Sequence, residues 1–431
     1  MRIKSFGIDS YRSCLKTKLT IRDELTGLIG VNGAGKSNIL NALVLLKKAF
    51  RTRPSTRSAD TPSPNKCHIS TEIEYQNKSV FISGNIGYET DEHNSDDVVS
   101  SKMKFNFREF VDYSGWINIP HYLLPESFHP LWTREGDKYF IPRNQLGLLE
   151  PNLFKNDSPF KYIFESKDLC SFLPQLANFL KGMNLYSASQ FSDPGRCPVA
   201  FDIEENRPLR TYPWRSGSVA HEQFILDLYK LYKSYKKPTK TGDDIPYKRF
   251  INTVNRDGIG LIDSADFDEI EMPSNYVEVK IGGKIKPIER TRHLMVPRFT
   301  INNVTLSPNQ LSEGTFKTLA LIFYILTDDS KLMLIEEPEV CVHHGLLNSV
   351  ISLIKIQSKQ KQIIISTHSD FVLDHLDPDD IQLVRRLPQR GTVSTALNKT
   401  LSKNDYRALR SYLQESGNLG EYWKGSGFIN D

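Results

Sequence analysis

The sequence lacks long apolar runs and any organised set of cysteines. Its best uncharged apolar run, Thr318–Thr327, has about half the length needed to cross a bilayer. The opening residues, MRIKSFGIDSYRS, contain no apolar core of signal-peptide length, so we expect a cytoplasmic protein without a membrane span. The cysteines form no C-x-x-C pair, which argues against a zinc site and predicts reduced thiols. They are Cys14, Cys67, Cys170, Cys197 and Cys341.

The chain also lacks a large excess of either charge. A net charge of +4 over 431 residues permits contact with nucleic acid but creates no strong electrostatic field by itself. With 39% hydrophobic and 25% charged residues, the composition is that of a folded globular protein, which excludes wholesale disorder. At roughly 150 residues per domain, the length allows two or three packed units.

The distribution of apolar residues predicts an α/β core that is split by a long middle segment. A strand, a glycine-rich loop and a helix come first, and Ser70–Glu89 alternates as an antiparallel hairpin does. Residues from about 90 to 185 are irregular, Val219–Asn255 has helical periodicity, and 256–306 alternates again. From Leu311 onward, helices and strands alternate. The expected divisions are an N-terminal lobe at 1–90, a middle segment at 91–300 and a C-terminal lobe at 301–431.

Gly30–Ser37 (GVNGAGKS) matches the phosphate-binding pattern G-x-x-x-x-G-K-[ST] in full. An apolar stretch precedes it, and a helix with Ile39 and Leu43 on one face follows, so a chance glycine-rich turn explains it poorly. In this pattern backbone N–H groups surround the phosphates, Lys36 reaches the β- and γ-phosphates, and the Ser37 hydroxyl ligates Mg²⁺. The residues expected to contact ATP are Gly30, Asn32, Gly33, Ala34, Gly35, Lys36, Ser37 and Asn38.

Two further apolar runs end in polar residues. Leu332–Ile335 is followed by Glu336 and Glu337, and acids at the end of a buried strand can serve the Mg²⁺ shell and the attacking water. Because adjacent strand residues point oppositely, the two carboxylates can take different roles. The second run, Gln362–Ile365, leads to His368, at a strand end of the kind where open α/β sheets bind ligands. Each feature alone could be structural, but the phosphate-binding loop in the same chain gives both more weight.

Leu311–Thr315 (LSEGT) opens a predicted helix whose apolar face begins at Phe316. Ser312 suits the N-cap, and Gly314 leaves backbone N–H groups open to an anion. A helix start of this kind is ordinary when it stands alone. Here Glu337 follows Leu311 after 26 residues (337 − 311), so the helix start, the acid pair and the histidine strand come in close succession.

The order of these four motifs resembles that of the ABC ATPases, with LSEGT in the place of their LSGGQ signature. The long separation of Ser37 and Leu311, with 273 residues between them (311 − 37 − 1), is similar to that in the branch of RecF, the SMC proteins and the overcoming-lysogenisation-defect nucleases, whose split heads carry a helical arm. IEEPE, STHS and Gly417–Trp423 are similar to bacterial AAA-family ATPases of phage-defence islands. Tyr186–Phe191 (YSASQF) is similar to the ATPase subunits of the phage anti-restriction-induced system.

The resemblance implies a role for each matched residue. Glu337 would orient the attacking water, while Lys36 and His368 would contact the phosphates. Glu336 would accompany Ser37 at Mg²⁺, although most relatives have Asp at that position. ATP would bind between two copies arranged head to tail, because the signature of one copy would face the phosphate-binding loop of the other. The signature residues expected at ATP are Ser312, Glu313 and Gly314.

Relatives also use a glutamine at the root of the inserted segment to sense the γ-phosphate and Mg²⁺. Gln190, which follows the predicted strand NLYSAS, is the expected residue. Gln76 is the alternative, although it falls in a stretch that looks like a hairpin.

An ATPase head of this kind is a switch, and two roles stay open for it. The resemblance implies a subunit of bacterial anti-phage defence that dimerises around ATP and controls a separate effector protein, such as a nuclease encoded nearby, in response to DNA or a phage protein. The alternative is a DNA-repair or DNA-clamp ATPase similar to RecF and the SMC proteins. The cations of residues 47–57 could contact DNA, although a helix C-terminus also favours cations. We do not expect a self-contained nuclease, because only 63 residues (431 − 368) follow His368.

Overall fold

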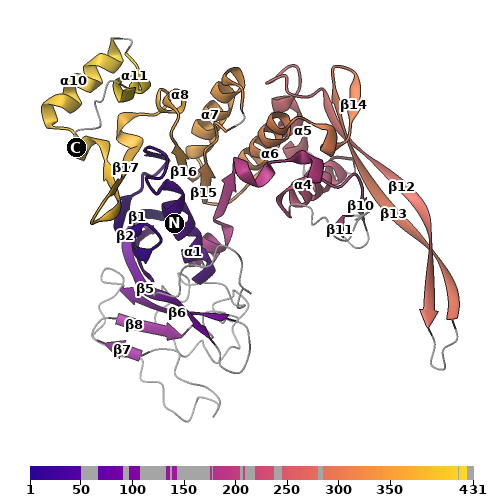
Figure 1. The fold of residues 1–431 in the computed structure, drawn as a ribbon, viewed down its shortest axis with the longest axis horizontal. Helices are drawn as coiled ribbons and strands as arrows, with labels where there is room; N and C mark the ends of the chain where they lie inside the picture. The colour runs from indigo at the N-terminus through magenta and orange to yellow at the C-terminus, as the bar shows by residue number, and fades with distance from the viewer. Residues whose placement is uncertain are drawn as a thin grey trace. The chain divides into compact units, whose positions relative to one another are not determined.

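The computed structural model forms two compact units, which are described separately (Figure 1). Unit 1 comprises Met1–Leu185, Asp329–Glu337 and Ser358–Asp431, and unit 2 comprises Tyr186–Asp328 and Pro338–Gln357. The residues that the structure describes are 1–49, 67–90, 97–106, 133–135, 138–142, 175–176, 178–203, 207–208, 219–236, 245–279, 285–340, 342–415 and 417–424.

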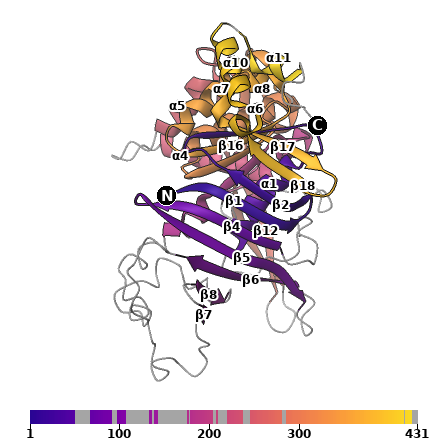
Figure 2. The same ribbon diagram turned by 90° about the vertical axis from the view of Figure 1, so that its left-hand side faces the viewer.

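Unit 1 contains a seven-stranded antiparallel sheet, in which β1, β4, β5 and β6 run side by side (Figure 2). Residues of β1 and β4 alternate between buried and accessible, as in a sheet with one packed face. The predicted hairpin is confirmed, since β4 and β5 pair and are joined by Gln76 and Asn77, both with positive φ. In sheet order the strands are β2 (Cys14–Thr20), β1 (Arg2–Tyr11), β4 (Cys67–Tyr75), β5 (Lys78–Thr90), β6 (Asp97–Asn106), β8 (Lys138–Pro142) and β7 (Thr133–Glu135).

The second sheet of unit 1 has its central strands parallel. The pairs β17–β3, β3–β16 and β16–β15 are parallel, whereas β18 pairs antiparallel with β17. β3, β15 and β16 are apolar and buried almost throughout, which is typical of a parallel sheet covered on both faces. In sheet order the strands are β18 (Gly391–Ala396), β17 (Ile381–Leu387), β3 (Leu25–Ile29), β16 (Gln362–Thr367), β15 (Leu332–Glu336) and β9 (Asn184–Ser187).

Helix α1 (Lys36–Ala49) links the two sheets of unit 1 into one core. Its Ile39 and Leu43 are fully buried, as predicted, in a cluster that includes Phe6 of β1 and Leu334 of β15. Unit 1 also contains the helical elements α8 (Asp370–Leu373), η8 (Pro378–Asp380), α9 (Leu397–Thr400), α10 (Lys403–Gln414) and α11 (Leu419–Lys424).

Unit 2 combines helices with a small antiparallel sheet. β12 (Ser264–Val279) and β13 (Ile285–Ile301) pair along their whole length and extend as a long ribbon beyond α4, α5 and α6 (Figure 1). The sheet order is β11-β10-β13-β12, with β14 also on β13. The remaining elements are η5 (Ala188–Phe191), η6 (Pro194–Arg196), β10 (Phe201–Asp202), β11 (Arg207–Pro208), α4 (Val219–Lys236), α5 (Ile245–Val254), β14 (Val304–Leu306), η7 (Pro308–Gln310), α6 (Glu313–Thr327) and α7 (His344–Ser358).

An aromatic cluster forms the core of unit 2. Phe224 of α4 lies edge-on to Phe316 and Phe323 of α6, with ring centroids 5.4 Å apart in both pairs. Phe250 of α5 meets Phe323 in the same way. These side chains are fully or nearly fully buried, so α4 and α5 are held to α6 by apolar and aromatic contacts.

The helical periodicity at Val219–Asn255 is confirmed by α4 and α5, and the strands at 256–306 and the alternation after Leu311 are confirmed as well. The expectation of irregular structure between 90 and 185 is wrong in part, because β6, β8 and β7 extend the antiparallel sheet. Cys14, Cys67 and Cys197 are buried and form no disulfide among the described residues, while Cys170 and Cys341 lie outside the described residues. Among the described residues, no helix is both long and apolar enough to span a membrane.

Candidate functional site

The phosphate-binding loop lies between β3 and α1 of unit 1. The loop leaves the buried strand at Gly30, and α1 begins at Lys36. Gly33 and Gly35 have φ angles of +80° and +103°, which glycine adopts far more readily than other residues. A Cβ on Gly35 would also collide with the hydroxyl of Thr392. Both the backbone and the packing therefore require glycine at position 35.

Lys36 folds back over this loop. Its Nζ donates hydrogen bonds to the carbonyl oxygens of Gly30 at 2.7 Å and Val31 at 3.2 Å, and the residue is 5% exposed. Ser37, by contrast, is exposed in the first turn of α1. The N–H groups at a helix N-terminus favour an anion, so the ammonium of Lys36 and the hydroxyl of Ser37 lie where phosphate oxygens and their Mg²⁺ would approach.

Residues far away in the sequence support the loop. The hydroxyl of Thr392 on β18 donates to the carbonyl of Ala34 at 3.0 Å and lies 2.7 Å from the hydroxyl of Ser13. The side-chain amide of Asn38 donates to Ser13 Oγ at 2.6 Å, and its carbonyl accepts from Arg12 at 3.4 Å. The sequence assigned Asn38 to ATP, whereas the structure engages its side chain in this support. Ser13 and Thr392 were missed, because a single hydroxyl on a strand carries no pattern.

The acid pair and the histidine strand end at the same edge of the parallel sheet as the loop. Glu336 of β15 is level with Ser366 of β16, and Ser366 is level with Leu28 of β3. Since the strands are parallel, their carboxyl ends lead to one edge, where ligands of open α/β sheets bind. The predicted strand ends are thus brought together, with Glu336 half-buried at the last position of β15.

Glu337 leaves β15 with an unusual backbone and contacts the histidine. Its φ is +47°, in the left-handed region that few residues other than glycine adopt. Its N–H donates to the carbonyl of Ser366 at 2.8 Å, and its Oε1 lies 3.3 Å from His368 Nδ1. Both side chains remain partly accessible, at 33% and 40%. Backbone strain of this kind often marks functional sites, so the carboxylate–imidazole pair is the strongest candidate for chemistry.

The donors at this edge suit a magnesium ion that takes most of its ligands from ATP. Among the described residues, no group of three His, Cys, Asp or Glu side chains could hold a metal alone. Mg²⁺ normally binds one or two protein oxygens together with phosphates and waters, which the exposed Ser37 and half-buried Glu336 could provide. The buried hydroxyl of Ser366 has no hydrogen-bond partner among the described residues. This hydroxyl, at the same edge of the sheet, can therefore still form a hydrogen bond.

The signature residues begin α6 in unit 2. Ser312 is the N-cap, as predicted, and its Oγ accepts from Thr315 N–H at 3.2 Å. Ser312 and Glu313 are exposed, and Gly314 is half-buried. Glu313 pairs with Lys317 one turn later, with 2.6 Å between Oε1 and Nζ. The Lys317 ammonium lowers the pKa of the Glu313 carboxyl. Glu313 is therefore engaged with its own helix.

Gln190 also belongs to unit 2, in the short helix η5. It is exposed, and its Oε1 accepts from the Ser187 N–H at 3.4 Å. The alternative, Gln76, occupies the β4–β5 turn with φ of +50°, and its Nε2 donates to Tyr75 Oη at 3.3 Å. The assignment of Gln190 to the γ-phosphate and Mg²⁺ stays a prediction.

Two families match the chain over separate stretches. Residues 1–163 match the family described as "AAA ATPase domain", and residues 203–374 match "AAA domain, putative AbiEii toxin, Type IV TA system". The first stretch contains the phosphate-binding loop, and the second contains the signature, the acid pair and His368. Over these two stretches the chain resembles ATPases of the AAA type. No curated protein matches the chain.

Solved structures with similar folds include three heads of SMC proteins. The SMC head domain from Thermotoga maritima is 12% identical, covers 92% of this chain and 99% of its own, and gives a TM-score of 0.41. An Smc head bound to the C-terminal winged-helix domain of ScpA is 14% identical, with coverage of 93% and 99% and a TM-score of 0.47. An Smc head with an extended coiled coil from Pyrococcus furiosus is 14% identical, with coverage of 95% and 99% and a TM-score of 0.40.

Proposed function

We propose that this chain binds ATP with Mg²⁺ and hydrolyses it, and that Glu337 orients the attacking water. The observation that carries the proposal is the pair formed by Glu337 and His368, 3.3 Å apart at the sheet edge to which the P-loop strand also leads. Positive φ at Glu337 turns the residue out of the strand direction. A carboxylate held in this way is suited to accept a hydrogen bond from water as it attacks the γ-phosphate.

Different residues would then contact the phosphates and the Mg²⁺ of the nucleotide. The N–H groups between Gly30 and Ser37 surround the phosphates, and Lys36 exchanges its carbonyl partners for phosphate oxygens. Ser37 and Glu336 would hold Mg²⁺, which would neutralise charge on the phosphates. His368 Nδ1, when protonated, donates to Glu337 Oε1 and keeps the carboxylate oriented.

Two copies would complete the site. Ser312 presents its exposed side chain at the first turn of α6, where backbone N–H groups are open to an anion. In a head-to-tail dimer this turn meets the γ-phosphate held by Lys36 of the partner copy. ATP binding would then favour closure and hydrolysis would favour opening, because only the triphosphate reaches both copies.

The switch would serve bacterial defence against phage by controlling a separate effector protein. The family matched by residues 203–374 is described by its AbiEii toxin and type IV toxin–antitoxin connection, which supports this role over a housekeeping one. The ATP-bound dimer would hold the effector, and DNA or a phage protein would trigger its release.

Two substitutions test the chemical core. Lys36→Ala should abolish nucleotide binding, whereas Glu337→Gln should retain ATP and lose turnover by about 10²- to 10⁴-fold, as general-base losses do. Binding is measured with a fluorescent ATP analogue, and turnover by phosphate release. The matched control is Glu415→Gln, which makes the same chemical change at an exposed end of α10. Parental turnover in Glu337→Gln would remove Glu337 from the mechanism.

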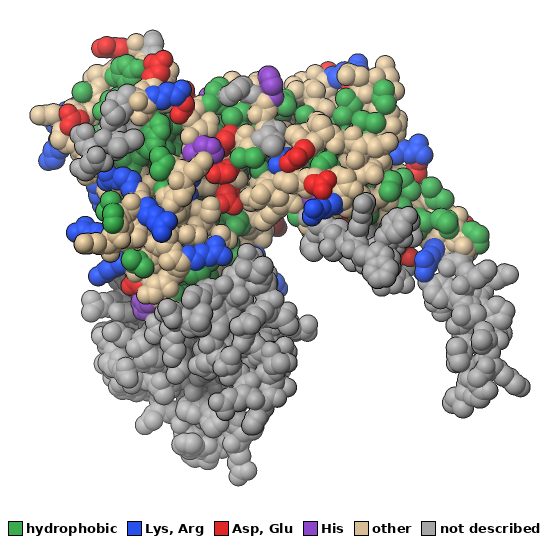
Figure 3. Space-filling view, in the orientation of Figure 1, with side chains coloured by type: hydrophobic (Ala, Val, Ile, Leu, Met, Phe, Trp, Pro, Cys, Tyr) green, Lys and Arg blue, Asp and Glu red, His purple; other side chains and the backbone are tan. Residues whose placement is uncertain are grey.

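A nucleic-acid clamp is the second candidate function, and a basic surface on unit 1 favours it. β18 lies beside β2, since Thr392 N–H donates to the Ser13 carbonyl at 2.7 Å. Figure 3 shows Lys and Arg side chains gathered over this part of unit 1. No cation of this surface forms an ion pair with another described residue, and phosphates attract such groups. The surface consists of Arg12, Lys16, Lys18, Arg385, Arg386 and Arg390.

The cations of residues 47–57, which the sequence suggested as DNA contacts, are weaker candidates for binding DNA than this surface. Lys47 donates to the carbonyl of Met183 and, at 3.0 Å, to the side chain of Asn184, so its ammonium group is already engaged in hydrogen bonds within unit 1. Arg51, Arg53 and Arg57 lie outside the described residues. Reversing Arg386 and Lys16 to Glu should weaken duplex DNA binding and flatten its salt dependence if the clamp function holds. Unchanged affinity at low salt would leave the effector switch as the better account.

A further inference from the structure

The segment from Tyr186 to Ser192, which contains Gln190, lies along the signature helix α6. The ring of Tyr186 stacks on that of Tyr324 with centroids 4.6 Å apart, and its hydroxyl donates to Asp328 at 2.6 Å. Phe191, at the other end of η5, is 6.1 Å from the same Tyr324 ring. Gln190 therefore sits in a segment that is anchored to α6 on both sides.

His221 of α4 lies between this segment and the first turns of α6. It is fully buried, and its ring stacks on Phe316 with centroids 5.0 Å apart and planes at 30°. On another side it meets Phe191 edge-on, at 6.3 Å and 71°. Phe316 is two residues after Gly314, and Phe191 directly follows Gln190. One imidazole thus touches the neighbours of both predicted ATP-contacting segments.

The two nitrogen atoms of the His221 ring are buried without hydrogen-bond partners among the described residues. A buried polar group normally has such a partner. Burial lowers the pKa of His221, while the backbone carbonyls of Phe191 and Ser192 act in the opposite direction. A neutral ring that still carries one N–H therefore faces carbonyls that are close but not yet bonded to it.

We propose that His221 is a positioning residue that couples Gln190 to the signature helix. This inference rests on the proposed function, in which Gln190 senses the γ-phosphate and Ser312–Gly314 meet the ATP of a second copy. A small shift of Phe191 and Ser192 brings a carbonyl to the N–H of His221, and the stacked Phe316 carries that shift to the start of α6. The ATP-bound position of the Gln190 segment thereby gains a hydrogen bond that the present position lacks.

A second link runs between the same two segments. The side chain of Ser192 acts on Glu313 in the direction that lowers its pKa, alongside the stronger contribution of Lys317. Glu313 adjoins Gly314, so Ser192 influences the charge of the signature, while His221 reaches the signature through its stacking on Phe316. The segment that contains Gln190 is therefore linked to the signature in two ways, and the link through His221 includes two ring nitrogens without a hydrogen-bond partner among the described residues.

The decisive variant is His221→Phe, which keeps an aromatic ring on Phe316 and removes both nitrogens. ATP affinity at the P-loop should stay within about two-fold of the parent, while kcat at saturating ATP should fall at least about five-fold, the lower end of usual coupling effects. His221→Gln, which restores an N–H donor, should recover part of the loss. The control is Phe224→Leu, which loosens the same aromatic cluster from the same helix without touching a polar group.

A double-substitution cycle with Gln190→Ala separates coupling from packing. If His221 acts through Gln190, the two losses of kcat should not add, whereas independent effects add. Parental kcat in His221→Phe would overturn the inference, and so would an equal loss in Phe224→Leu or additive losses in the cycle. Glu337→Gln in the same assay reports on the proposed function separately. If that variant loses turnover while His221→Phe does not, only the coupling fails.

Discussion

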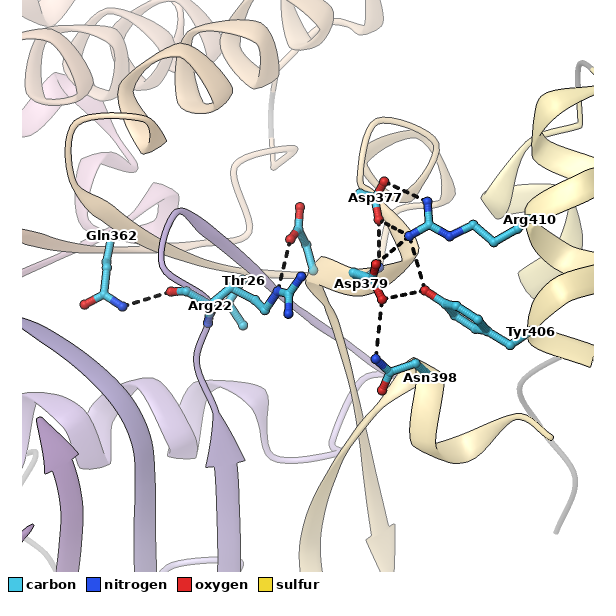
Figure 4. A network of polar contacts seen from close by, with 9 residues as sticks. Arg22, Thr26, Gln362, Asp377, Asp379, Asn398, Tyr406 and Arg410 are labelled. Atoms are coloured by element: carbon cyan, nitrogen blue, oxygen red, sulfur yellow. Dashed lines mark hydrogen bonds and ion pairs between the residues drawn. The ribbon is translucent and has the colours of Figure 1, made fainter. Parts of the chain in front are cut away.

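Asp380 is expected to destabilise the folded protein near neutral pH, so Asp380→Asn should stabilise it. Asp380 ends η8, directly after Asp379, which belongs with Asp377, Tyr406 and Arg410 to the polar network shown in Figure 4. Burial, followed by the charge of Asp377, raises the pKa of Asp380 from 3.8 to about 6. Arg22 acts in the opposite direction, but its half-exposed guanidinium is 3.7 Å from the carboxylate, so it compensates only partly.

A carboxyl with a higher pKa in the folded state binds its proton more tightly there, so its destabilising effect is fully present above about pH 6 and is lost as the pH falls from about 6 towards 3.8. The shift from 3.8 to about 6 corresponds to about 3 kcal/mol at 1.36 kcal/mol per unit. Because the side chain is 26% exposed, solvent screening reduces this to about 1–2 kcal/mol. At pH 4.5 the stabilisation by Asp380→Asn should be about one third of its value at pH 7.5.

Hydrogen exchange of amides in β17 and α10 at pH 7.5 and pH 4.5, corrected for intrinsic rates, measures the local free energy of opening. The neighbouring Asp379 provides a control of opposite sign. The hydroxyl of Tyr406 donates to it at 2.6 Å and is the main cause of its lowered pKa. Its contribution is therefore present above pH 3.8 and is lost as the pH falls further, so Asp379→Asn should destabilise at pH 7.5. The reasoning is refuted if Asp380→Asn also destabilises there, or if its gain is the same at both pH values.

Two further predictions concern the support of the P-loop. Gly35→Ala places a methyl group against Thr392 at a φ of +103°, so nucleotide binding measured by titration should weaken by more than about ten-fold; binding within two-fold of the parent would contradict the packing argument. Thr392→Val keeps the shape of the side chain but removes the hydroxyl that donates to Ala34, which should cost about 1–3 kcal/mol in urea unfolding, and an unchanged midpoint would show that this bond is dispensable.

Local patterns in the sequence were sufficient for the parts of the site that depend on neighbouring residues. The glycines of the P-loop, the N-cap at Ser312 and the β4–β5 hairpin each follow from the conformational preferences of a few consecutive residues. The same applies to the strand ends at Glu336 and His368, because apolar runs bounded by polar residues predict buried parallel strands.

Features that depend on distant residues could not be predicted. Thr392 and Ser13 meet across 379 positions, and nothing near either hydroxyl indicates its partner. His221 looks like an ordinary helical residue until Phe191 and Phe316 are brought to its two sides. Strands such as β6 and β8 were missed because they add to the edge of an existing sheet, where weak alternation suffices once a partner strand is present.

We propose that each ATP site is made from the P-loop of one copy and the signature of another. Mixing Lys36→Ala chains with Gly314→Asp chains tests this arrangement, since the first retains its signature and the second its P-loop. Each variant alone should be inactive. In an equal mixture, half of the dimers are mixed and half of their sites are intact, so phosphate release should return to about a quarter of the parental rate. A mixture that stays inactive, although mixed dimers are demonstrated by mass, would contradict the shared site.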